Sequence, residues 1–203
     1  MLSTTDAIVL SLQPHSDKAH LLHAYTRASG RVNYMVYGLG RKHAIGLYMP
    51  LSLIRITASY PPNGVPTLRE ATSLSAKRSV SETVCQYNGL SGGARLYKQT
   101  IRLFIAEVLH HVLRHPMTDE AMYDFLEHAI CELDTMEEVQ NFHVQFLIDF
   151  AAKLGFAMET APALPQTRAQ RQKTLQQLCA YFEEHVDTWQ NPRSMDVLME
   201  VFD

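Results

Sequence analysis

Positive and aromatic side chains gather in one short part of the chain, around residues 27–42. From Arg31 to Tyr37, every second residue is in turn a cation, an amide, a methionine and an aromatic ring. In an extended strand such alternating residues lie on one face. Guanidinium groups bind phosphates, and a tyrosine ring can stack on a base of any type. The pattern therefore predicts contact with nucleic acid.

Other cations lie close to this stretch in the sequence. Arg27 precedes it, and Arg41 and Lys42 follow it in a longer connection over residues 38–50. If the stretch is a strand of a barrel, these charges can line one groove of its surface. The same cations could instead form an ordinary solvated surface, and Tyr37 could pack at a barrel rim rather than stack on a base. The residues alone leave both interpretations open.

The charge of the chain is divided between its two parts. The 203 residues have a formal net charge of −3. Residues 1–80 hold nine Lys and Arg against three Asp and Glu, a net charge of +6, whereas residues 81–203 hold nine against eighteen, a net charge of −9. A basic segment joined to an acidic one predicts that the first meets a polyanion and that the second has another role.

Short stretches of alternating polarity, separated by turn residues, predict five strands in the first 75 residues. They are residues 7–12, 21–26, 31–37, 51–58 and 67–71. Five strands with a longer connection between the third and the fourth are typical of the OB-fold, a small Greek-key barrel that binds oligonucleotides. We therefore predict a five-stranded OB-fold barrel.

From about residue 94 the apolar spacing becomes helical, with intervals of three and four residues. The stretches are residues 97–112, 122–133, 142–154 and 175–186, followed by a short helix from Ser194 to about Val201. We predict an α+β protein of two domains. Residues 1–78 form the OB-fold nucleic-acid-binding domain, and residues 79–203 form an all-α helical domain that binds partners.

The sequence contains no nucleophile elbow, Walker lysine, Cys-His pair or paired acids suited to two metals, so we predict no enzyme and no catalytic residue. The three cysteines lie 46 and 48 residues apart, which suits neither a zinc ribbon nor a disulfide framework. Glu107, His111 and His115 share one flank of a predicted helix, where a solvated histidine stripe is the preferred interpretation over a metal site. We expect no cofactor and no metal.

No apolar stretch approaches the ~20 residues that span a bilayer, and the first residues do not resemble a signal peptide. The chain is therefore expected to be cytoplasmic and to have no membrane partner.

Several short segments follow one another in a characteristic order. In the first part they are Ile8-Val9-Leu10, Thr26-Arg27 with Gly30-Arg31, Gly38 with Arg41-Lys42, Met49-Pro50-Leu51-Ser52 and Leu68-Arg69-Glu70-Ala71. In the second part they are Phe104-Ile105-Ala106-Glu107-Val108-Leu109 and Leu154-Gly155-Phe156. The ordered set covers almost the whole chain, and it resembles the RecO family of bacterial recombination mediators.

The resemblance implies an OB-fold that binds single- and double-stranded DNA and anneals complementary strands without ATP. It implies that the helical domain engages RecR and the C-terminal tail of the single-strand-binding protein SSB, so that RecA is loaded on SSB-coated DNA. It leaves open whether RecF takes part. Such a protein would act in DNA repair and recombination in the cytoplasm, at the nucleoid.

The resemblance also assigns roles by position. The phosphate contacts that it implies are Arg27, Arg31, Arg41 and Lys42, with Lys18, Arg55 and Arg69 as weaker candidates. For the SSB tail it implies an apolar groove between helices with a nearby cation, for which the candidates are Arg95, Lys98 and Arg102.

The chain departs from the family pattern in two respects. Many relatives carry a four-cysteine zinc element that is missing here, and the chain is short for the family. These departures bear on partner binding more than on DNA binding. The alternative functions are an OB-fold RNA-binding or protein-interaction adaptor without annealing activity and, less favoured, a hydrolase with a composite site.

Overall fold

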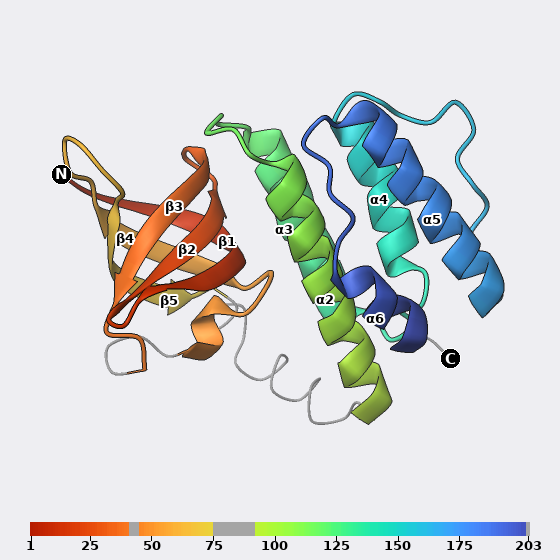
Figure 1. The fold of residues 1–203 in the computed structure, drawn as a ribbon, viewed down its shortest axis with the longest axis horizontal. Coiled ribbons are helices and arrows are strands. Elements are labelled where there is room, and N and C mark those ends of the chain that lie inside the picture. Colours follow the sequence, from red (N-terminus) through yellow and green to blue (C-terminus); the bar gives the residue numbers. More distant parts are fainter. Residues whose placement is uncertain (41–44, 75–91, 202–203) are drawn as a thin grey trace. The chain divides into compact units, whose positions relative to one another are not determined.

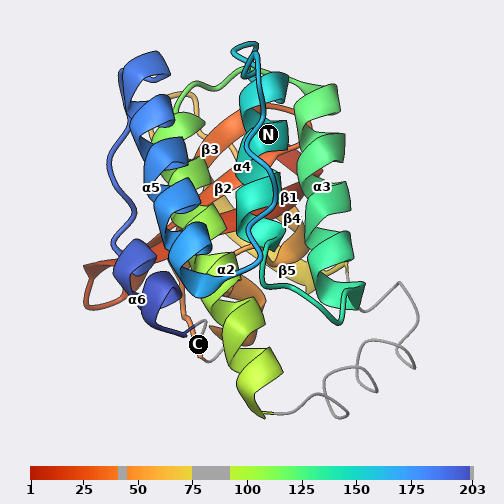
Figure 2. The ribbon, with the colours of Figure 1, turned by 90° about the vertical axis from the view of Figure 1, so that its right-hand side faces the viewer.

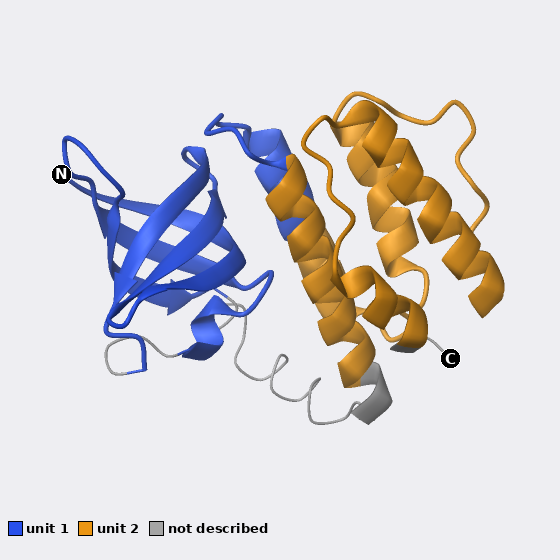
Figure 3. Ribbon diagram, viewed as in Figure 1, with its two compact units in different colours: residues 1–89, 113–127 blue, residues 90–112, 128–203 orange. Residues whose placement is uncertain are grey.

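The computed structural model describes residues 1–40, 45–74 and 92–201. Its contacts divide the chain into two compact units (Figure 3). Unit 1 comprises Met1–Gly89 and Leu113–Glu127, and unit 2 comprises Leu90–Val112 and His128–Asp203. The predicted boundary between residues 78 and 79 lies outside the described residues, so the two predicted domains stay a prediction.

Unit 1 contains a closed five-stranded barrel (Figure 1). Its strands are β1 (Leu2–Ser16), β2 (Ala19–Thr26), β3 (Gly30–Tyr37), β4 (Leu53–Ser59) and β5 (Thr67–Ser73), and a short 3-10 helix, η1 (Ile45–Tyr48), precedes β4. Around the barrel the order is β1-β2-β3-β5-β4. This order agrees with the five-stranded Greek-key barrel of the OB-fold, so the predicted fold class is confirmed.

β1 is much longer than the predicted strand over residues 7–12, because it pairs with two strands. Its first part pairs antiparallel with β4, from Leu2 opposite Ser59 to Ile8 opposite Leu53. Its second part pairs antiparallel with β2, as far as Ser16 opposite Ala19. The added residues are mostly exposed and polar, so they carry no apolar alternation that a sequence pattern could detect.

The interior of the barrel is filled by the inward-facing side chains of all five strands, which form one core. It includes Val9, Leu22, Ala24, Tyr34, Val36, Ile54, Ile56 and Leu68, all of them buried. In β3, Tyr34 and Val36 belong to this core whereas Tyr37 is exposed, as the predicted alternation requires. The hydroxyl groups of Tyr34 and Tyr60 lie 2.9 Å apart, and burial raises the pKa of Tyr34.

The helices follow the predicted stretches closely. They are α2 (Gly92–Val112), α3 (Glu120–Thr135), α4 (Phe142–Lys153), α5 (Arg168–His185) and α6 (Ser194–Val201). α5 begins earlier than its apolar residues indicate, because a reciprocal capping box joins Thr167 and Gln170. The part of α3 up to Glu127 belongs to unit 1 and the rest to unit 2.

Within unit 2, α4 packs against α5 and α6 packs against α2 (Figure 2). A row of aromatic rings passes through the interface of α4 and α5, where the Phe150 and Phe182 rings are stacked with centroids 6.0 Å apart. No helix in the described part of the chain is both long enough and apolar enough to cross a membrane.

A polar contact within unit 2 joins α2 to the start of α6. Glu107 of α2 accepts hydrogen bonds from the backbone N–H and the hydroxyl of Ser194, at 2.9 and 2.7 Å, and thereby caps the start of α6. Glu107 is thus a capping residue in this structure. Among the residues that the structure describes, no group of three His, Cys, Asp or Glu side chains could hold a metal ion.

His143 of α4 is buried, with an exposed fraction of 2%, and packs edge-on against Phe104. Burial, helped by the charge of Arg171, lowers the pKa of His143 to about 3. The ring is therefore neutral at physiological pH and behaves as a core residue.

Replacing this ring by an aromatic ring that does not titrate (His143→Phe) should remove part of the loss of folding stability at acidic pH. The ordinary pKa of 6.5 means that the unfolded chain takes up a proton well before the buried ring does. Between pH 7 and 5 the wild-type protein should lose about 2 kcal/mol of unfolding free energy through this group, and the variant should not. Urea unfolding at the two pH values measures the difference. The control His128→Gln, at an exposed position of α3, should keep the wild-type loss.

Candidate nucleic-acid interface

The outer face of β2 and β3 is the surface that the sequence singles out. Its cross-strand pairs are Leu21 with Met35, His23 with Asn33 and Tyr25 with Arg31. The Nδ1 atom of His23 lies 2.7 Å from Oδ1 of Asn33. Burial lowers the pKa of His23, with a smaller contribution from the charge of Arg31, so the ring adds little positive charge at neutral pH.

Residues 113–127 of the same unit cover one end of this face. The Tyr25 and Tyr123 rings are stacked, with centroids 6.5 Å apart and planes inclined by 15°. Gly30 has a φ of +61°, and a Cβ atom there would overlap the carbonyl oxygen of Met117. Only glycine permits so close an approach, so the β2–β3 turn and this segment are closely packed.

Arg31 lies at the covered end and is half-buried. Burial first, and then the positive charge of Arg114, lower the pKa of Arg31 to about 10. The side chain is still a cation at neutral pH, but it is less exposed than its place on an outer face suggests. No sequence signal indicates Arg114 as a neighbour of Arg31, because it is 83 positions away in the chain and no motif surrounds it.

The end of β3 at Tyr37 is more exposed than the end at Arg31. The Tyr37 side chain is 50% exposed, and its backbone register partner on β2 is Ala19, the residue after Lys18 in the β1–β2 turn. Figure 1 shows this turn beside the end of β3. Lys18 is itself exposed. A cation and a half-exposed ring therefore lie at the same end of the barrel.

Arg69 reaches the same level of the barrel from β5. β3 and β5 run parallel, with Met35 opposite Thr67, so Tyr37 and Arg69 each lie two residues further along. Arg69 is the extra residue of a β-bulge, because Glu70 is opposite Thr57 whereas Leu68 is opposite Ala58. It is exposed. Three predicted residues, Lys18, Tyr37 and Arg69, are thus exposed on neighbouring parts of the barrel, and together they are named here the Tyr37 end.

Arg41 and Lys42 lie outside the described residues. Their predicted contact with phosphates stays a prediction. In the chain they follow Tyr37 by four and five residues.

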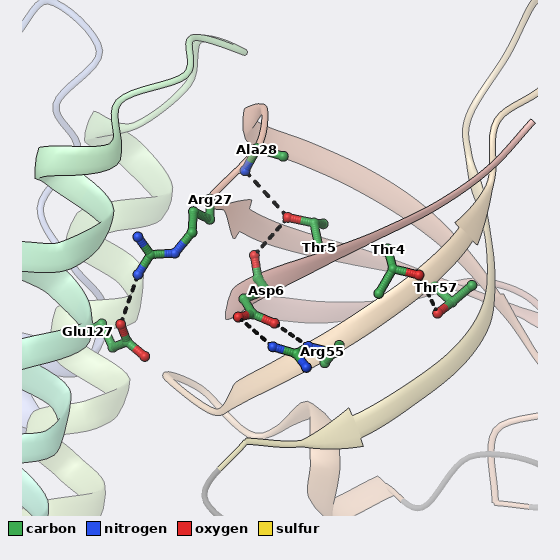
Figure 4. A network of polar contacts seen from close by, with 8 residues as sticks. All are labelled: Thr4, Thr5, Asp6, Arg27, Ala28, Arg55, Thr57 and Glu127. Atoms are coloured by element: carbon green, nitrogen blue, oxygen red, sulfur yellow. Dashed lines mark hydrogen bonds and ion pairs between the residues drawn. The ribbon is translucent and has the colours of Figure 1, made fainter. Parts of the chain in front are cut away.

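Arg55 is held by an acidic neighbour on the adjacent strand. Its Nε and Nη2 atoms lie 2.7 and 3.0 Å from the two carboxylate oxygens of Asp6 (Figure 4). This two-point ion pair raises the pKa of Arg55. Beside it, the Thr4 and Thr57 hydroxyl groups lie 3.0 Å apart. The fork of the guanidinium group is already occupied, which reduces its capacity for a phosphate.

Arg27 is held by two carboxylates of α3 and one ring. Its Nη1 lies 2.7 Å from Oδ1 of Asp124. Its Nη2 lies 3.0 Å from Oε2 of Glu127 (Figure 4). Its Cζ lies 4.4 Å from the centre of the Tyr123 ring. Burial works against the charge, but the two carboxylates outweigh it and raise the pKa of Arg27. The sequence did not indicate these partners, which are about a hundred positions away.

A closed five-stranded barrel of this order, with helices after it, places the protein among the OB-fold proteins. Comparison with family models identifies the particular family. Residues 1–76 match the model of the recombination protein O N terminal domain, and residues 94–162 match that of the recombination protein O C terminal domain. The chain therefore belongs to the RecO family.

Individual relatives agree with this assignment. The chain is 32% identical over 165 residues to a protein of Phocaeicola vulgatus named DNA repair protein RecO, an alignment that covers 79% of this chain and 64% of the relative. It is also 32% identical to a Bacteroides fragilis protein of that name, covering 76% of this chain and 61% of the relative. A Flavobacterium johnsoniae protein of the same name is 24% identical, with 98% of each chain covered. The chain thus spans less than two thirds of the first two relatives.

Replacing Gly30 by alanine should destabilise unit 1 because of the close approach to Met117. The matched control is Gly40→Ala, since Gly40 also has a positive φ, +81°, but a Cβ atom there meets nothing within 4 Å. The control should cost about 1–2 kcal/mol from backbone strain alone. Gly30→Ala should cost at least about 2 kcal/mol more, because backbone atoms must move. Chemical unfolding of both variants measures this, and equal losses would contradict the packing of residues 113–127 on the barrel.

Proposed function

We propose that this protein is a DNA repair protein and recombination mediator that acts in the cytoplasm, at the nucleoid. In this proposal the barrel binds single- and double-stranded DNA and anneals complementary strands without ATP, and no catalytic step is involved. The observation that carries the proposal is the Tyr37 end, where an exposed ring lies among cations on an OB-fold of the RecO family.

The chemistry of the Tyr37 end suits a single strand. A tyrosine ring can stack on any base, which contributes about 1–3 kcal/mol per base. Lys18 and Arg69 can neutralise phosphates on either side of it, and Arg41 and Lys42 follow in the chain as further candidates. Each neutralised phosphate releases bound counterions and reduces the repulsion between two strands. Pairing of complementary strands then needs no nucleotide hydrolysis.

Variants of the Tyr37 end separate stacking from charge. Tyr37→Ala should weaken binding of single-stranded DNA by about 5- to 150-fold at every salt concentration, whereas Tyr37→Phe should retain most of the affinity because it keeps the ring. The double variant Lys18→Ala, Arg69→Ala should reduce the slope of log affinity against log salt by about 1.4, which corresponds to two lost phosphate contacts. Fluorescence anisotropy across a salt series measures both effects.

The control for charge is Lys173→Ala with Arg193→Ala, which removes two exposed cations from unit 2. Its slope should equal that of the wild-type protein. A change of slope as large as that of the barrel variant would contradict this placement of the site.

Annealing of complementary oligonucleotides, with and without SSB, tests the mediator function itself. We expect ATP-independent annealing that the Lys18→Ala, Arg69→Ala variant impairs. RNA bound much more tightly than DNA, or DNA binding without annealing, would favour the adaptor alternative. Arg31 is retained as a phosphate contact in the proposal, although its half-burial makes its contribution smaller than that of an exposed arginine.

We further propose that unit 2 binds protein partners, namely RecR and the C-terminal tail of SSB, and so assists the loading of RecA. The earlier candidates Lys98 and Arg102 are poor choices for this role. Lys98 donates a hydrogen bond of 2.8 Å to the carbonyl oxygen of Asp134, and Arg102 forms an ion pair with the Asp134 carboxylate. Both cations are buried, so they fix α2 to the end of α3.

Instead we propose for the tail a small pocket between α4, α5 and α6. It is lined by His143, Arg168, Arg171, Gln172, Leu175, Leu198 and Met199. The Nε atom of Arg171 is buried and has no hydrogen-bond partner among the described residues. The pocket therefore combines apolar walls with a cation that a ligand carboxylate could bind.

Arg171→Met should weaken binding of a labelled SSB tail peptide at least about tenfold, because a charge-assisted hydrogen bond contributes about 1.5–3 kcal/mol. The methionine keeps most of the apolar contacts. The control is Lys173→Ala, an exposed cation two positions away on the same helix, which should leave binding unchanged. Isothermal titration calorimetry measures the affinities, and an unchanged affinity for Arg171→Met would place the tail elsewhere.

A further inference from the structure

Arg27 is fixed in its backbone but not in the far part of its side chain. Its N–H donates to the carbonyl oxygen of Asp6 at 2.9 Å, and the Thr26 hydroxyl donates to the carbonyl oxygen of Gly30 at 3.0 Å across the turn. The strand end is therefore anchored by the barrel itself. Only the guanidinium group depends on α3, through Asp124 and Glu127.

The two carboxylates surround Arg27 as two phosphate oxygens would. Each contributes one oxygen to a different Nη atom, at 2.7 and 3.0 Å, while the Tyr123 ring supports the guanidinium plane. Planar guanidinium groups bind carboxylates and phosphates with the same fork geometry. A phosphate could therefore take the place of these carboxylates without a new conformation of the turn.

The ion pairs of Arg27 with Asp124 and Glu127 are weak enough for a phosphate to replace a carboxylate. The Arg27 side chain is 35% exposed, and the side chains of Asp124 and Glu127 are 62% and 21% exposed. The pair with Asp124 is exposed enough to contribute little to stability and to be screened by salt, whereas the pair with Glu127 is more buried. A nucleic-acid strand carries many phosphates, so at low salt it can compete for the cation.

We propose that Asp124 and Glu127 act as an internal phosphate mimic, which occupies Arg27 and weakens the binding of nucleic acid to the barrel. The proposal rests on the proposed function, because it assumes that the barrel binds DNA. While the carboxylates hold Arg27, this arginine displaces no counterions from DNA. Removing the two negative charges makes it available to one further phosphate.

The test is DNA binding by the double variant Asp124→Asn, Glu127→Gln of the full chain, measured by anisotropy from 50 mM to 1 M salt. One additional phosphate contact should steepen the slope for single-stranded DNA by about 0.7 and tighten binding about five- to tenfold at 50 mM salt. Adding Arg27→Ala should cancel both gains. Arg27→Ala in the wild-type background should have a smaller effect than in the double variant.

The matched control is Glu120→Gln with Glu132→Gln, which removes two exposed negative charges from the same helix. The proposal is refuted if the control steepens the slope of log affinity against log salt as much as the double variant does. It is also refuted if adding Arg27→Ala does not cancel the gain in affinity of the double variant. A thermal melt checks folding, and if the double variant is unfolded, Asp124→Asn alone should show a gain in the same direction. Absence of salt-dependent DNA binding in the wild-type protein would instead refute the proposed function.

Discussion

The barrel depends on one strand, β1, that pairs with two others. Its first half joins β4 and its second half joins β2, so β1 closes the sheet that β2, β3, β5 and β4 would otherwise leave open. A register shift between Val9 and Ser11 accompanies the change of partner. Bulges of this kind bend a strand and increase its twist, which a small closed barrel requires.

This closure positions the Tyr37 end. The turn from β1 to β2 carries Lys18, and the pairing of β2 with β3 places it next to Tyr37. The parallel contact of β3 with β5 then places Arg69 at the same level. No sequence motif links these three residues. The strand pairing alone makes the elements that carry them neighbours in the barrel.

The positive charges of the barrel have different environments, so the net charge of residues 1–80 overstates the charge available to a phosphate. Lys18 and Arg69 are exposed, Arg31 is half-buried, and Arg27 and Arg55 are paired with carboxylates of the same unit. An arginine with its fork occupied contributes less to counterion release than a solvated one. Asp124 and Glu127 belong to the acidic part of the chain, so their ion pairs with Arg27 reduce the positive charge that the basic part offers to a phosphate.

Much of the architecture could be predicted from the sequence, because alternation and helical spacing are local properties. The residues by themselves determined strand β3 with its two faces, the helices in the described part of the chain and the change from strands to helices. Tertiary structure decided the length of β1, the burial of Arg31 and the partners of Arg27 and Arg55, since each depends on residues far away in the chain. The sequence could indicate which cations face outward, but only the fold determined which of them already have a carboxylate, because an ion pair is formed by distance in space.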